Sequence, residues 1–229
     1  MLTLLLLACT NPQEETALDT APSPPPPEEL YGLLSVDGTA FESEDRGASV
    51  RLNFEHGELP RTEAGDCYDF SASTYDAYFY VRGGEEELTL DGEPFLGSVE
   101  GWPAGSLVSA RTSGDLFPGF DLGAGLLVPE WVDVRVDQEA STYGGFLNVS
   151  WSPLATGWVV VRVSARTDPE ASSQRVCVFP ASAGSARVFA DNKTVLWTAS
   201  FVTEELLPLP PTQGILVRFQ TGLVGTPLW

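Results

Sequence analysis

The chain has 229 residues, of which 43% are hydrophobic and 19% charged, a composition that suits one or two globular domains and excludes a wholly disordered chain. Twelve basic and thirty-two acidic residues give a net charge of −20, which repels a phosphate backbone and argues against nucleic acid as a partner. The single histidine, His56, excludes metal sites and proton relays that need several imidazoles.

The first nine residues read MLTLLLLAC, an apolar run much shorter than the ~20 residues of a membrane-spanning helix. It is typical of the core of a signal peptide over residues 1–8. Leu6-Leu7-Ala8-Cys9 resembles the lipobox of bacterial lipoproteins, in which the cysteine is lipidated and becomes the mature N-terminus. The resemblance implies that Cys9 carries a lipid anchor and that the protein is exported. The alternative is a chance apolar N-terminus with a buried cysteine.

Residues 9–29 form the next segment, which is rich in proline and glutamate and has few apolar side chains to bury. Such a composition favours extended polyproline II at ~3.1 Å per residue, so the segment could hold a domain up to roughly 60 Å from a membrane. We therefore expect a linker. Thr10 stands where enteric lipoproteins have the aspartate that resembles an inner-membrane retention signal. We expect the outer membrane or the cell surface as the location.

Beyond residue 30 the hydrophobic pattern has a period of two, which predicts strands that are buried on one face. In chain order, the predicted strands are Leu33–Val36, 48–54, Ala77–Val81, Glu87–Leu90, Leu107–Arg111, 131–137, Phe146–Trp151, 157–163, Gln174–Phe179, Ala186–Ala190, Val195–Phe201 and 214–220. Turns are predicted at Asp37-Gly38, Gly83-Gly84, Asp91-Gly92 and Gly144-Gly145. Only Thr203–Leu207 has helical character, and Pro208 would end that helix.

About a dozen short strands without long helices predict an all-β fold, an antiparallel β-sandwich of immunoglobulin-like or jelly-roll-like type, over residues 30–229. A split into two β domains at Gln138–Gly144 is the alternative, because QEASTYGG is typical of a linker. From Phe146 onward the segments FLNVSWSP, GWVVVRVSA, RVCVFP and ILVRF resemble the immunoglobulin-like or fibronectin-type-III-like modules of proline-linkered bacterial lipoproteins. The resemblance implies a fold and a location, and no reaction.

The motifs of common catalytic and metal sites are missing. No G-x-S-x-G elbow accompanies a serine, and His56 is expected in a solvated loop. Asp66-Cys67-Tyr68-Asp69 is the densest group of calcium-type ligands, but no D-x-D-x-D-G loop occurs. We therefore expect no cofactor and assign no metal. Pairs of carboxylates are abundant, which keeps a glycan hydrolase as an alternative.

Two pairs of residues are the remaining candidates. Cys67 and Cys177 are either a disulfide or two free core thiols, with Cys177 facing away from Val176 and Val178. Tyr78 and Tyr80 share one face of a predicted strand and could stack against sugar rings, or could be structural.

These observations favour a lipid-anchored envelope protein that binds or contributes structure without catalysis. Its expected partners are the membrane, through the lipid, and a glycan or an envelope protein. The runner-up is an exported glycan hydrolase that uses a carboxylate pair.

Overall fold

The computed structural model describes residues 25–41, 46–59, 61–63, 65–71, 81–95, 97–168 and 171–228. Within these ranges the chain consists of strands, loops and two single-turn 3-10 helices, η1 (Pro27–Glu29) and η2 (Ala181–Ala183). The predicted all-β sandwich is confirmed. In the described ranges no helix is long and apolar enough to cross a membrane. Cys9, Tyr78 and Tyr80 lie outside the described residues.

The largest sheet has eight strands in the order β3-β13-β12-β15-β16-β1-β2-β6. All neighbours in it are antiparallel except β1 and β16, which run parallel. Its strands are β1 (Leu30–Phe41), β2 (Arg46–His56), β3 (Gly65–Ser71), β6 (Ser98–Glu100), β12 (Trp158–Asp168), β13 (Ala171–Pro180), β15 (Thr194–Leu207) and β16 (Ile215–Gly225).

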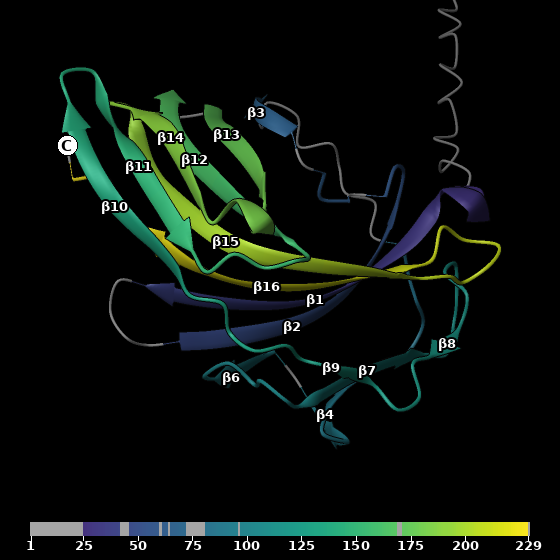
Figure 1. Cartoon of the computed structure of the whole chain (residues 1–229). Coiled ribbons are helices and arrows are strands. Elements are labelled where there is room, and N and C mark those ends of the chain that lie inside the picture. The colour runs from purple at the N-terminus through teal and green to yellow at the C-terminus, as the bar shows by residue number, and fades with distance from the viewer. Residues whose placement is uncertain are drawn as a thin grey trace, which may run out of the picture.

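Two smaller sheets cover the inner face of the large sheet (Figure 1). One has the order β10-β11-β14 and the other β5-β4-β7-β8, with β9 paired to β7. Each closes its own hydrophobic core, around Leu147 and Val161 in the first case and around Phe54 and Phe117 in the second. Their strands are β4 (Glu86–Leu90), β5 (Glu93–Pro94), β7 (Leu107–Thr112), β8 (Phe120–Asp121), β9 (Leu126–Leu127), β10 (Val134–Ser141), β11 (Gly144–Trp151) and β14 (Ser185–Asp191).

The last seven strands form a sandwich by themselves. The first, second and fifth of them (β10, β11, β14) face the third, fourth, sixth and seventh (β12, β13, β15, β16), an arrangement shared with immunoglobulin-type sandwiches. Strands from the first half of the chain extend both edges of the larger layer, β3 beside β13 and β1 beside β16. The large sheet therefore contains strands from both halves of the chain.

Residues 138–144, considered above as a linker, end β10 and begin β11. The two strands pair from Val134 opposite Trp151 to Ser141 opposite Gly144, so this stretch is a hairpin. The turn residues are Thr142 and Tyr143, whereas Gly144-Gly145, where the turn was predicted, begins β11. The predicted Asp91-Gly92 turn is confirmed between β4 and β5, with φ values of 53° and 82°.

Two further local predictions were wrong. Thr203–Leu207 is the end of β15 instead of a helix, because it pairs along its whole length with Ile215–Phe219 of β16, and this pairing overrides a weak local preference. Asp37-Gly38 lies within β1 instead of a turn. Gly38 is required there by packing, since a Cβ would lie 2.5 Å from the indole of Trp102.

A strap crosses the outer face of the large sheet. We use this name for residues 57–59 and 61–63, between the end of β2 and the start of β3. Five strands separate β2 from β3 in the sheet order. The strand register places Gly65 in the same row as Gly47, nine residues along β2 from His56, so the two ends of the strap are offset along the strands as well as across them. The strap therefore crosses the outer face of the sheet diagonally.

Candidate functional site

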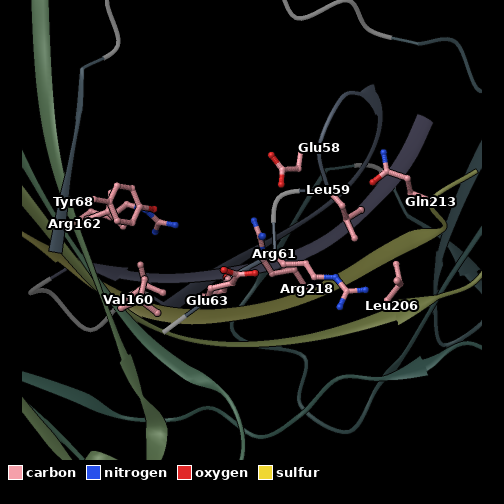
Figure 2. Close-up of a pocket in the computed structure, with 13 residues that line it drawn as sticks. Glu58, Leu59, Arg61, Glu63, Tyr68, Val160, Arg162, Leu206, Gln213 and Arg218 are labelled. Atoms are coloured by element: carbon pink, nitrogen blue, oxygen red, sulfur yellow. The ribbon is translucent and has the colours of Figure 1, made fainter. Parts of the chain in front are cut away.

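A groove of about 900 Å³ lies between the strap and the outer face of the large sheet (Figure 2). We call it the strap groove. Its walls come from the strap, from β3, β12, β13, β15 and β16, and from the loop before β16. The lining residues are Glu58, Leu59, Arg61, Thr62, Glu63, Tyr68, Val160, Arg162, Val176, Val178, Leu206, Gln213 and Arg218.

Glu204 holds the strap on the sheet near the C-terminal end of the strap, at Thr62. Its carboxylate accepts hydrogen bonds from the backbone nitrogen of Thr62 at 2.8 Å and from the Thr62 hydroxyl at 2.6 Å. The guanidinium of Arg218 donates to the same carboxylate at 2.8 Å through Nε. The side chains of Glu204 and Arg218 are only 9% and 18% exposed, so the charge-assisted bonds are protected from water.

The start of the strap is fastened to the loop before β16 and to η1. The Gln213 side-chain amide donates to the Gly57 carbonyl at 2.5 Å. The Gly57 nitrogen donates to the Glu29 carbonyl at 2.8 Å. The strap is thus a fixed wall of the groove, held by contacts at two points along its length.

Arg162 brings a positive charge to the sheet side of the groove. It is mostly buried, and among the described residues no carboxylate lies within ion-pair distance of its guanidinium. Burial lowers the pKa of Arg162, and the nearby charge of Arg218 lowers it further. Both effects disfavour the charged form, while Tyr68 and Asp37 oppose them more weakly. The fold therefore maintains a cation at this position against an electrostatic penalty.

The strand register places Arg162 in a row that runs across four strands. Tyr68 of β3 lies opposite Val176 of β13, Val176 opposite Arg162 of β12, and Arg162 opposite Thr198 of β15. Residues directly opposite one another in neighbouring strands share a face. Tyr68 and Arg162 are therefore about 10 Å apart between Cα atoms, on either side of Val176. Figure 2 shows their side chains together at one end of the groove.

Two further features of this row concern exposure and hydrogen bonding. The Tyr68 side chain is 54% exposed, so a face of its ring is accessible. Thr198 Oγ1 is buried and has no hydrogen-bond partner within the described part of the chain. An aromatic ring, a guanidinium and a spare hydroxyl thus occur together, a combination suited to recognition of a polar ligand and not required for packing.

Cys67 and Cys177 form a disulfide, which was one of the two alternatives that the sequence left open. The Sγ atoms are 1.97 Å apart and the Cα atoms 4.1 Å apart. The register of β3 and β13 shifts between Val176 and Val178, so the bond joins the strands at a bulge. Cys177 lies in the core with Val159 and Val161, on the opposite side from Val176 and Val178, as expected.

The other sequence candidates do not meet at one site. Tyr78 and Tyr80 lie outside the described residues, as does their predicted strand except for Val81, which lies in no strand. His56 ends β2 and is exposed. Asp69 pairs with Arg175 at 2.8 Å, which holds the pKa of that carboxyl below its usual range. In the described ranges no cluster of three or more His, Cys, Asp or Glu could hold a metal ion.

Sequence reasoning did not identify Arg162 and Arg218 as site residues. It treated both as the solvent-facing polar positions of half-buried strands. In β12, however, Val160 and Val161 on opposite faces are 2% and 0% exposed, so this strand is covered on both sides. A run of four apolar residues, Trp158–Val161, interrupted by an arginine was the available signal. A charge within a strand that is apolar on both faces indicates a buried cation.

No protein-family model matches the chain, and no curated protein matches it either.

Proposed function

We propose that this protein is an exported, lipid-anchored module that binds a ligand in the strap groove without transforming it. The proposed location follows from the resemblance of Leu6-Leu7-Ala8-Cys9 to a lipobox and from the proline-rich residues that follow. A disulfide such as Cys67–Cys177 is typical of proteins outside the reducing cytosol, which supports an exported location. We propose the outer membrane or the cell surface, and a glycan or an envelope protein as the partner.

Arg162 is the observation that carries the binding role. Charged side chains without a partner are rarely buried, because the desolvation penalty is not offset by an opposite charge. Arg162 lines a groove that is large enough for a small ligand or a few residues of a polymer. A ligand that supplies the missing negative charge would account for this cation.

A glycan hydrolase is the second candidate, because two carboxylates, Glu58 and Glu63, line the same groove. Hydrolysis by a carboxylate pair requires one acid to keep its proton near neutral pH, which is usually achieved by burial. Both Glu58 and Glu63 are exposed on the strap. The absence of burial favours binding over hydrolysis.

Retention of envelope glycans on the immobilised protein tests the proposal. Soluble glycan fragments from a bacterial envelope should be retained by the wild type and released intact, without new reducing ends. Tyr68→Ala removes an exposed groove residue and should reduce retention. Tyr143→Ala serves as the matched control, because Tyr143 is 78% exposed in the β10–β11 turn and is not a groove residue.

Two results would contradict this function. New reducing ends would support the hydrolase. Equal retention by the wild type, Tyr68→Ala and Tyr143→Ala would show that the groove is not the binding site.

The lipid anchor is tested separately by cell fractionation, where Cys9→Ala should move the protein from membranes to the soluble fraction of the same compartment. An unmodified Cys9 with Met1 intact in the mature protein would contradict the proposed lipidation.

A further inference from the structure

From the strap groove we infer the chemical class of the ligand: an acidic saccharide, whose carboxylate binds Arg162 and whose sugar ring stacks on Tyr68. This inference rests on the proposed binding function and adds the charge and the polarity of the ligand. Four features of the groove carry it: its charge, the row of side chains across the strands, its rim, and the arrangement of its two inner arginines.

The charge of the groove differs from that of the whole protein. Three of the twelve basic residues, Arg61, Arg162 and Arg218, line this one groove of a chain with a net charge of −20. Glu204 neutralises Arg218, but in the described residues no such acid pairs with Arg162. A guanidinium binds a carboxylate through two parallel hydrogen bonds, and this match is better than that with a neutral hydroxyl. The anionic group of the ligand therefore belongs at Arg162.

The row from Tyr68 to Arg162 matches a flat ring that bears a carboxylate. Tyr68 offers an accessible aromatic face at one position, and the guanidinium lies two strands away across Val176. A sugar ring has an apolar face of C–H groups that packs on an aromatic ring, while its substituents remain free for hydrogen bonds. A carboxylate on that ring can point along the row toward Arg162.

The rim of the groove selects hydroxyl groups over an apolar chain. Glu58 and Glu63 are exposed carboxylates on the strap, and carboxylates only accept hydrogen bonds when ionised. Sugar hydroxyls donate to such acceptors. A fatty-acid chain has no hydroxyl groups and makes no such hydrogen bonds, so the rim offers that class of acid no specific contact.

The inner arginines have separate roles. Arg218 is already bound by Glu204, which also holds Thr62 of the strap. Arg162 has no corresponding acid among the residues that the structure describes. Arg218 therefore keeps the strap in place, and Arg162 is the residue that determines specificity for an acidic ligand.

A pair of ligands that differ only in charge tests the inference. The full-length chain carrying Cys9→Ala, which needs no detergent, is titrated calorimetrically with a trisaccharide of galacturonic acid and with its methyl ester. The acid should bind, and the ester at least tenfold more weakly. Arg162→Gln should weaken binding of the acid at least tenfold and abolish the preference over the ester. Arg135→Gln, which removes an exposed positive charge from β10, should leave both affinities unchanged.

The contradicting outcomes separate this inference from the proposed function. Equal affinity for acid and ester, or an unchanged preference in Arg162→Gln, would overturn the assignment of an anionic ligand while leaving a binding groove. If neither trisaccharide binds but envelope glycans are retained through Tyr68, the acidic class is wrong and the function stands. If neither binds and nothing is retained, both are wrong.

Discussion

At the scale of single residues, small side chains and local charges decide how the layers of the molecule meet. Gly38 illustrates this, because its missing Cβ leaves room for two indole rings. Trp102 and Trp131 pack edge to face with ring centroids 5.8 Å apart, and Trp102 Nε1 donates to the Pro129 carbonyl at 2.7 Å. The indoles are thereby held against β1, where the second small sheet meets the large one.

Gly38→Ala should destabilise the fold by about 1–3 kcal/mol, the usual cost of overpacking a core. The added Cβ would lie 2.5 Å from Trp102 and 2.8 Å from Trp131. Gly47→Ala in the adjacent strand is the control, since its nearest neighbour would be 4.0 Å away. Urea unfolding of both variants measures the difference. A similar stability of the two variants would show that the indoles move aside freely.

The ion pair of Asp69 and Arg175 predicts a dependence of stability on pH. Hydrogen bonding to Arg175 lowers the pKa of Asp69. A group whose pKa is lower in the folded state contributes stability that is complete above its unfolded pKa and is lost as pH falls through its folded pKa. The stability difference between the wild type and Asp69→Asn should therefore shrink below about pH 4.

Urea unfolding at several pH values measures this difference. Asp137→Asn, which removes an exposed carboxylate from β10, is the control and should show no comparable trend. A difference for Asp69→Asn that stays constant down to pH 2 would contradict the assignment of the shift to this pair.

At the scale of elements, the strap crosses the outer face of the large sheet and β3 extends the edge of that sheet beside β13. Glu204 holds the strap, and the disulfide holds β3 to β13. β3 is an edge strand with exposed side chains at Cys67, Tyr68 and Asp69, so few apolar contacts hold it in place. Covalent and charged contacts replace hydrophobic packing in this part of the fold.

Loss of the disulfide should destabilise the protein by at most ~4–5 kcal/mol, the chain-entropy value for a closed loop of this size. The two cysteines are 110 residues apart in the sequence. Cys67→Ser is the suitable variant, because Cys67 is exposed and the buried Cys177 remains a small apolar side chain. A reductant should lower the stability of the wild type and leave Cys67→Ser unaffected. Equal stability of the oxidised and reduced wild type would contradict a structural role for the bond.

Thr62→Val should loosen the strap without unfolding the sheet. It removes the hydroxyl that donates to Glu204 at 2.6 Å and keeps the shape of the side chain. Hydrogen exchange should become faster in residues 57–63 and remain unchanged in β12 and β15. Thr226→Val, at an exposed position near the C-terminus, is the control. Unchanged exchange in the strap would show that the other contacts suffice to hold it.

At the scale of the whole molecule, the sequence predicts most strands but not their partners. The alternation of apolar and polar residues in β2, β10 and β16 indicates that one face of each strand is buried, and this pattern is a local property of the sequence. The parallel pairing of β1 with β16 joins Gly32 to Ile215, and no local pattern specifies that contact. The strap groove combines strap residues near position 60 with strands near positions 160, 176 and 218, so its composition follows only from the complete topology.

Glu204 shows the same limit for the candidate site. In the sequence, Glu204 belongs to Thr203–Leu207, a short segment with helical character, and it is interpreted as a solvated surface charge. In the fold it lies on β15, where Thr62 of the strap and Arg218 of β16 bind its carboxylate. Helix propensity depends on the residues of Thr203–Leu207 alone, whereas the conformation of this segment is determined by its pairing with β16.

The central claim is that Arg162 serves a ligand at a cost to the stability of the empty protein. Thermal unfolding of Arg162→Met, with and without the galacturonic acid trisaccharide, tests it most directly. Without ligand the variant should unfold at a higher temperature than Arg135→Met, because only Arg162 is a buried cation that lacks an acid partner in the described residues. A gain of about 1 kcal/mol corresponds to ~2–4 °C for a chain of this length. With ligand, the wild type and Arg135→Met should be stabilised and Arg162→Met should not. A lower unfolding temperature for unliganded Arg162→Met, or equal stabilisation of all three proteins by the ligand, would contradict the account.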